Sequence, residues 1–192
     1  MNVLIIPEDF TKDQHVLKPI IKAMLQQLGK PQANVKPCMD PRLGGIGQAL
    51  EWDAIERIID QYKAMNDLFI LAVDRDGEAT RRAVLDEIER KATAILGENR
   101  FYAENAWQEI EVWAIAGQDL PQGWSWQAIR AEIHPKENYF EPLARSRGLD
   151  REPGGGRKTL GIEAAKNYKR ARSLCQEDLG ALENRLAEKF KK

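Results

Sequence analysis

The chain has 192 residues, a formal net charge of −1 and 43% hydrophobic residues, which fits one globular domain with a sizeable core. It has no run of roughly 18 apolar residues and no basic-then-apolar leader, so we expect a cytoplasmic protein without a membrane segment. Two distant cysteines, Cys38 and Cys175, and two histidines, His15 and His134, argue against zinc or histidine-rich sites and leave oxygen ligands for any metal.

Apolar runs of strand length alternate with stretches of helical periodicity along the first 117 residues. The expected strands are residues 2–6, 33–40, 68–73 and 109–117. The expected helices are residues 16–28, capped by Thr11 or Asp13, then 48–65 and 78–96. Regular alternation of this kind predicts an α/β fold, with a parallel sheet and helices on both of its faces.

The second part of the chain has a different character. Residues 121–156 are rich in proline, glycine and aromatic residues and predict an irregular segment, whereas residues 161–190 have helical periodicity. We therefore divide the chain into an α/β domain, residues 1–120, and residues 121–192, an irregular segment with a basic C-terminal helix packed on or extending that domain. Residues 157–192 carry a charge of +5 and the rest of the chain −6.

Acidic side chains gather where the predicted strands end. They are Glu8 and Asp9 after the first strand, Asp74 and Asp76 after the third and Asp119 after the fourth, with Glu109 and Glu111 inside the fourth. Sites in open parallel sheets lie beyond the carboxyl ends of the strands. If the central strands are neighbours, Glu8, Asp74 and Asp76 converge there.

Such convergence has an electrostatic cost. Adjacent carboxylates repel by about 1 kcal/mol per pair in water and by several times more when partly buried. A bound cation offsets this repulsion, and Mg²⁺ suits a few carboxylates together with water and phosphate oxygens. The alternative is a structural one, because Asp-x-Asp is common in turns, where aspartate accepts local backbone hydrogen bonds.

An acidic residue that closes the first strand, with Asp-x-Asp closing the third, resembles the Toprim domain. The matching residues are Glu8 in "LIIPED" and Asp74 and Asp76 in "LFILAVDRDG". The segment "EIEVWAIAG" is similar to small stand-alone Toprim-related proteins that are often encoded beside ABC-type ATPases in bacterial defence loci. Asp9 stands where the family usually has glycine. No tyrosine nucleophile motif or zinc-binding primase module is present, so the topoisomerase and primase branches are disfavoured.

The resemblance covers residues 1–120 and implies a Mg²⁺-dependent phosphodiester hydrolase, a nuclease. Asp74 and Asp76 would hold Mg²⁺, and Glu8 would act as general base or as a further ligand. Glu111 would extend the metal shell, with room for a second ion. The same resemblance implies a role in anti-phage defence with an ABC-type ATPase as partner.

Basic residues in the last third of the chain suggest where a nucleic acid, DNA or RNA, would bind. "EPGGGRKTLG" is not a phosphate-binding P-loop, because Arg157 stands where glycine is required and no strand precedes it. We expect Arg157 and Lys158 in this loop, and Lys169 and Arg170 in the last helix, to contact a phosphate backbone. The alternative is a linker followed by an ordinary solvated helix face.

Two other function classes remain open from the sequence. A receiver-like signalling domain also has an acidic pair after its first strand, here Glu8 and Asp9, and an aspartate after its third, here Asp74. Against it, no serine or threonine closes the fourth strand and no lysine follows a clear fifth. The second alternative is a catalytically inactive Toprim scaffold whose acidic residues bind a partner protein.

Overall fold

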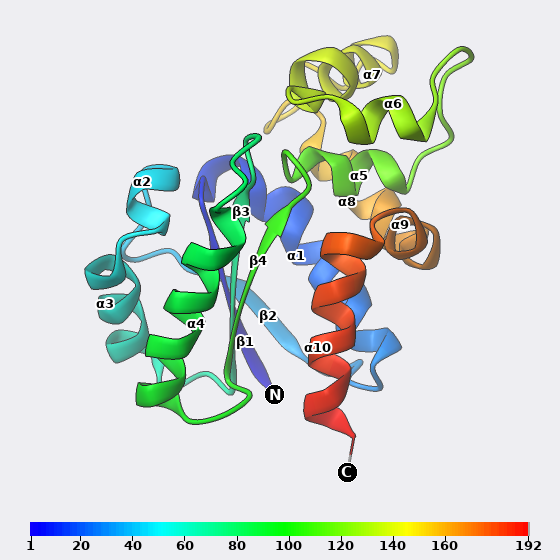
Figure 1. Ribbon diagram of the computed structural model, residues 1–192. Coiled ribbons are helices and arrows are strands. Elements are labelled where there is room, and N and C mark those ends of the chain that lie inside the picture. The colour runs from blue at the N-terminus through cyan, green and yellow to red at the C-terminus, as the bar shows by residue number, and fades with distance from the viewer. Residues whose placement is uncertain (192) are drawn as a thin grey trace.

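Four parallel strands form the centre of the molecule. The computed structural model describes residues 1–191. The strands are β1 (Asn2–Pro7), β2 (Asn34–Pro37), β3 (Leu68–Asp74) and β4 (Phe101–Ala106), in the order β2-β1-β3-β4. Helices cover both faces of this sheet, as Figure 1 shows, so the fold is the predicted α/β class with a Rossmann-like parallel sheet.

The two central strands are buried on both faces because their side chains alternate between two apolar layers. Val3 and Ile5 pack toward one layer and Leu4 and Ile6 toward the other. In β3, residues Leu68–Val73 are all at most 1% exposed. An unbroken apolar run is typical of a parallel strand covered on both sides, which is why these strands are recognisable in the sequence.

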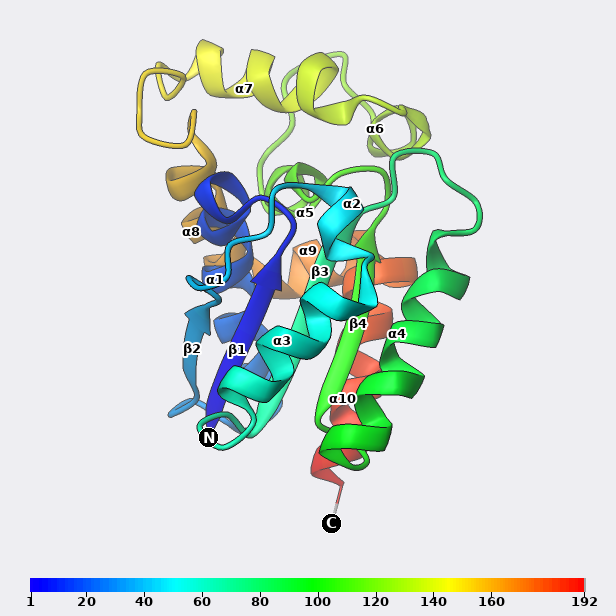
Figure 2. The same ribbon diagram turned by 90° about the vertical axis from the view of Figure 1, so that its left-hand side faces the viewer.

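Helices α3 and α4 cover one face of the sheet, and α1, α5 and the C-terminal helices cover the other (Figure 2). The bounds of the first helices are α1 (Phe10–Gln27), α2 (Ile46–Ala49), α3 (Trp52–Tyr62) and α4 (Arg81–Leu96). The cap of α1 is Asp9, whose carboxylate accepts hydrogen bonds from Thr11 N at 2.8 Å and Lys12 N at 3.3 Å. The prediction of Thr11 or Asp13 as the cap was therefore wrong.

The fourth strand is not the segment predicted from the sequence. Residues 109–117 hold a helix, α5 (Glu111–Ala116), and the strand is the preceding segment Phe101–Ala106. All six residues of α5 are buried. When every side of a short apolar segment is buried, its sequence has no polar face, so its periodicity cannot distinguish a helix from a strand. The strand in the structure, β4, contains the buried polar residues Glu104 and Asn105, so its sequence lacks the apolar run by which a buried strand is recognised.

The segment predicted to be irregular contains regular structure. Its elements are α6 (Trp126–Ala131), the π-helical turn η1 (Lys136–Phe140) and α7 (Glu141–Ser146). The expected single basic helix is divided into α8 (Arg157–Lys166), α9 (Tyr168–Leu174), the π-helical turn η2 (Gln176–Gly180) and α10 (Ala181–Phe190). Within the described residues, no helix is long and apolar enough to cross a membrane.

Close helix packing joins the C-terminal helices to the α/β core. A Cβ atom added at Gly161 in α8 would lie 2.5 Å from the carbonyl oxygen of His15 in α1. One added at Gly117, which follows α5, would lie 2.3 Å from the Cα of Ala164 in α8. Residues from α1, α5, α8, α9 and α10 accordingly belong to one apolar cluster. The segment after residue 120 completes the core of the α/β domain.

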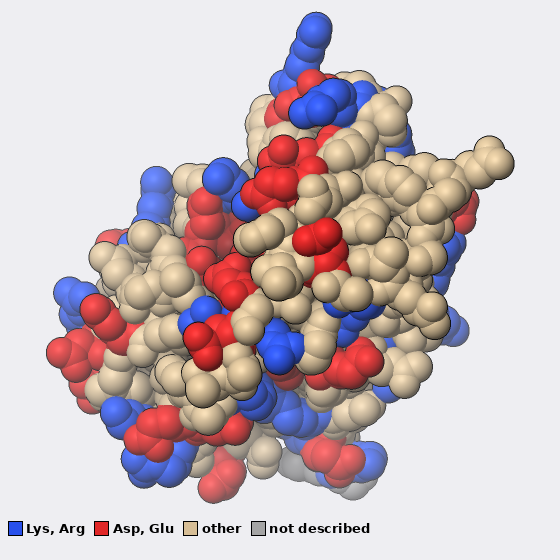
Figure 3. Space-filling model, turned by 45° about the horizontal axis from the view of Figure 1, so that its top comes forward, with Lys and Arg blue, Asp and Glu red and all other residues tan. Residues whose placement is uncertain are grey.

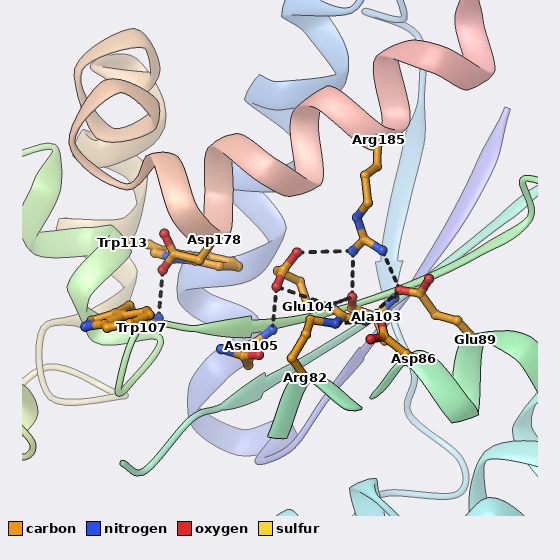
Figure 4. Close-up of polar contacts among 10 residues, drawn as sticks. All are labelled: Arg82, Asp86, Glu89, Ala103, Glu104, Asn105, Trp107, Trp113, Asp178 and Arg185. Atoms are coloured by element: carbon orange, nitrogen blue, oxygen red, sulfur yellow. Dashed lines mark hydrogen bonds and ion pairs between the residues drawn. The ribbon is translucent and has the colours of Figure 1, made fainter. Parts of the chain in front are cut away.

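A polar network fixes the outer edge of the sheet at β4 (Figure 4). The carbonyl of Ala103 accepts hydrogen bonds from Arg82 of α4 and Arg185 of α10, each at 2.7 Å, and its N–H donates to Glu89 at 2.6 Å. Glu104 pairs with both arginines, at 3.3 and 3.1 Å. Side chains therefore occupy backbone groups of an edge strand that would otherwise be open to pairing.

Candidate metal centre

The carboxyl ends of β1 and β3 meet at one end of the molecule, and acidic side chains collect there. Figure 3 looks onto this end and shows acidic residues gathered near its middle. Asp74, Asp76 and Glu109 each offer a carboxylate oxygen, and these oxygens lie within 4.8 Å of one another. Glu8, at the end of β1, joins them through its Oε2, which accepts a hydrogen bond from Asp74 N at 3.1 Å. The predicted convergence of Glu8 and Asp74 is present in the structure.

The turn that carries Asp76 is held by Gln108, in the loop after β4. The carbonyl of Gln108 accepts hydrogen bonds from Arg75 N at 2.8 Å and Asp76 N at 3.1 Å, and its Oε1 accepts from Gly77 N at 2.7 Å. Both Asp76 and Gln108 have positive φ angles, 53° and 71°. This clamp places the Asp-x-Asp turn against the β4 loop, which brings Glu109 into the cluster.

Asp74 is the most strongly perturbed carboxyl of the cluster. Burial raises its pKa well above the ordinary value, and nearby Glu111, Glu8 and Asp13 raise it further. A hydrogen bond of 2.8 Å from Ile110 N to Asp74 Oδ1 lowers the pKa of Asp74 in part. The pKa of Glu8 is also raised, by burial first and by Asp76, although the N–H of Asp74 partly compensates.

Glu109 takes the place in the cluster that the sequence assigned to Glu111. Glu109 is 5% exposed, and its Oε2 accepts a hydrogen bond from Lys136 N at 2.7 Å. Lys136 Nζ lies 3.5 Å from its other oxygen, and burial still raises the pKa of Glu109. In the strand predicted for this segment, Glu109 and Glu111 would share one face, so the pattern does not favour Glu109 over Glu111. In the structure Glu109 precedes α5 and Glu111 is its first residue, and Glu109 joins the cluster.

Glu111 is paired in the interior. Arg157 Nε donates to Glu111 Oε1 at 2.8 Å, Nη2 contacts the same oxygen, and Nη1 donates to Gly154 O at 3.0 Å. Arg157 is only 7% exposed and forms an ion pair with Glu111. The expectation that it contacts a phosphate backbone from the surface is therefore corrected. Glu111 still acts on the cluster at a distance, since it contributes to the raised pKa of Asp74.

Asp13, in the first turn of α1, is a further buried carboxyl that the sequence reasoning did not assign to the site. Its Oδ2 accepts a hydrogen bond from Asp9 N at 2.8 Å. Burial, together with Glu111, Asp9 and Glu8, raises the pKa of Asp13 to about 7. Its only sequence signal was a position near a helix start, which does not distinguish a cap from a member of an acidic cluster.

The other predicted surface cations are exposed but dispersed. Lys158 lies in the first turn of α8, whereas Lys169 and Arg170 lie on α9. Arg170 pairs at 2.7 Å with Asp119, which is fully exposed and follows α5, not the end of a strand. Lys169 and Arg170 line an open hollow of about 780 Å³ between α1 and the α8–α9 segment, together with Lys22.

The structure therefore defines an α/β protein with a Rossmann-like parallel sheet and an acidic cluster at the carboxyl ends of its central strands. No protein-family model, curated protein or solved structure matches the chain.

Proposed function

We propose that the protein is a Mg²⁺-dependent phosphodiester hydrolase of the Toprim-like type that acts on nucleic acid. The observation that carries the proposal is the group of oxygens from Asp74, Asp76 and Glu109, all within 4.8 Å of one another beside Glu8. Carboxylate oxygens are the ligands that a hard cation prefers. The raised pKa values of Asp74 and Glu109 are those of carboxyls that a bound cation would stabilise in their charged form.

Each residue has a distinct role in this proposal. Asp74 and Asp76 would hold the ion, as the Toprim resemblance implies, and Glu109 replaces Glu111 as the further ligand. Mg²⁺ at such a site stabilises charge on a phosphate and lowers the pKa of a bound water. Glu8 would accept the proton of the attacking water, a role that a carboxylate with a raised pKa suits.

The nucleic-acid substrate and the partner are parts of the same proposal. The charge of +5 on residues 157–192 supports binding of a polyanion, with Lys158, Lys169 and Arg170 as the exposed contacts. The resemblance to proteins encoded beside ABC-type ATPases adds a role as the effector of a defence system. Because the sequence lacks a P-loop, control by nucleotide would come from that ATPase partner.

The deciding experiment compares Asp74→Asn and Asp76→Asn with wild type. Asparagine preserves an acceptor oxygen for Ile110 N, so the fold should persist while the ion is lost. We expect labelled DNA or RNA to be cleaved by wild type with Mg²⁺ but not with EDTA, and by neither variant. Mg²⁺ at about 100 times its Kd should stabilise wild type by about 2.7 kcal/mol and leave the variants unchanged.

Asp60→Asn is the matched control, since Asp60 is an exposed aspartate of α3 that pairs with Lys63 at 2.8 Å. It should retain both cleavage and stabilisation by Mg²⁺. Wild type that is neither stabilised by Mg²⁺ nor able to cleave any nucleic acid would contradict the proposal. Covalent labelling of Asp74 by acetyl phosphate would favour the receiver-like alternative instead.

A further inference from the structure

Arg81, the first residue of α4, has a buried guanidinium group with an unpaired donor. Its exposed fraction is 9%, and its Nε is the one buried side-chain nitrogen or oxygen without a hydrogen-bond partner among residues 1–191. Nη2 lies 3.5 Å from the carbonyl of Arg75 and 3.8 Å from Asp76 Oδ2. Both contacts are longer than an ordinary charge-assisted hydrogen bond.

A guanidinium group has five N–H donors, and leaving a buried donor unpaired destabilises a protein. The neighbouring Arg82 shows the usual solution, because it donates to Asp86 and to Ala103 O at 2.8 and 2.7 Å. Arg81 has no comparable set of acceptors. Buried polar groups without partners are rare in native proteins and call for an explanation such as a bound ligand.

The surroundings of Arg81 favour an anion as the missing partner. Arg81 stands at the N-terminus of the 16-residue helix α4, whose first turn has no acidic residue. The positive end of the helix dipole and the guanidinium charge therefore act in the same direction. Among residues 1–191, only the Asp76 carboxylate lies near enough to form an ion pair with Arg81, and Asp76 belongs to the candidate metal centre.

We propose that Arg81 binds a phosphate oxygen of the substrate beside the metal ion, an inference that rests on the proposed function. The planar fork of the guanidinium matches two phosphate oxygens, which accounts for a side chain that is buried and yet poorly paired. In the absence of a ligand, its charge faces Asp76. Once a cation binds Asp76, the guanidinium is free to bind the anion, and the two positive charges share the phosphate.

The test measures the binding of Mg²⁺ and of inorganic phosphate separately in Arg81→Met, Arg81→Lys and wild type. Removing a neighbouring positive charge should leave Mg²⁺ binding unchanged or tighten it, as followed by calorimetry. Phosphate binding in saturating Mg²⁺, followed by ³¹P NMR, should weaken about tenfold or more in Arg81→Met. Arg81→Lys keeps the positive charge but lacks the planar guanidinium, so its phosphate affinity should lie between those of wild type and Arg81→Met.

The control is Arg90→Met, because Arg90 lies on the same helix and pairs with Glu87 on the surface. It should change neither affinity. Unchanged phosphate binding in Arg81→Met, or a parallel loss of phosphate and Mg²⁺ binding in both Arg81 variants, would overturn the role of Arg81. If wild type binds no Mg²⁺, the proposed function fails; phosphate binding that still depends on Arg81 would then preserve the anion site alone.

Discussion

Asp178 joins the C-terminal segment to the loop after β4, which contributes Glu109 to the candidate metal centre, and its removal should destabilise the whole domain. It is 1% exposed and lies in η2. Its Oδ2 accepts a hydrogen bond from Trp107 N at 2.7 Å, which Figure 4 shows. The same oxygen accepts from Trp113 Nε1 at 2.8 Å and from Arg130 Nη1 at 3.1 Å. Asp178→Ala would leave all three donors without this acceptor.

The magnitude follows from those contacts. A buried donor left unpaired costs about 1–3 kcal/mol, and breaking a buried ion pair costs about 3–5 kcal/mol. Arg130 keeps a second partner, Glu177 at 3.0 Å, so the ion-pair contribution falls below that range. We expect Asp178→Ala to lower the free energy of unfolding by about 4 kcal/mol in total, a large share of the roughly 5–15 kcal/mol of a typical domain.

Urea unfolding followed by circular dichroism measures this difference, with the slope on urea concentration checked for a two-state transition. Asp178→Asn keeps the shape and one acceptor oxygen, so it should lose about half as much stability. A loss below about 1 kcal/mol in Asp178→Ala would refute the reasoning, since it would mean that the three donors find other partners.

Three further predictions concern titration, packing and charge. Burial raises the pKa of Asp13 to about 7, so between pH 3.8 and 7 the folded state holds a proton that the unfolded chain releases. The free energy of unfolding should therefore fall as pH rises through this range, by at most about 1.4 kcal/mol per pH unit. Asp13→Asn should flatten this part of the urea-midpoint profile, and an unchanged profile would contradict the assignment. Gly161→Ala should destabilise the fold by about 1–3 kcal/mol, because its Cβ would lie 2.5 Å from a carbonyl oxygen of α1; an unchanged melting temperature would contradict this. Replacing Lys158, Lys169 and Arg170 by serine should weaken nucleic-acid binding without changing sequence preference and flatten the salt slope by roughly two to three units. Fluorescence anisotropy at several salt concentrations tests this, and an unchanged slope would exclude these residues as phosphate contacts.

The parts of the fold that local sequence determines were predictable. The apolar run Leu68–Val73 is buried by layers on both faces, and the helical spacing of Val16, Ile20 and Met24 gives α1 its buried face. Since parallel neighbours end at the same edge of a sheet, the acidic residues after β1 and β3 had to approach each other. This logic needs only the strand order, and the structure has β1 beside β3.

The fourth strand could not be recognised because its polar residues have partners far away in the sequence. Glu104 is buried on β4, and its partner Arg185 is 81 residues further along the chain. No local sequence pattern predicts such a pair, so the apolar segment that follows β4 was predicted as the strand instead. With the segment predicted as a strand, the sequence did not distinguish Glu109 from Glu111, and Glu111 was assigned to the cluster in which the structure has Glu109.

The guanidinium groups of Arg157 and Arg81 differ in what they leave for a ligand. Arg157 is bonded to Glu111, 46 residues away, and is thereby unavailable to a ligand, while Glu111 still raises the pKa of Asp74. Arg81 approaches Asp76 without a short hydrogen bond and keeps its Nε unpaired. Burial raises the pKa values of Asp74, Glu8 and Glu109, and neighbouring carboxylates raise them further. A divalent cation would supply the missing charge at Asp76 and would also release Arg81 from it. On the proposed function, the metal ion would thus bind first, to the carboxylates, and the phosphate group would then bind to the metal ion and to the guanidinium of Arg81.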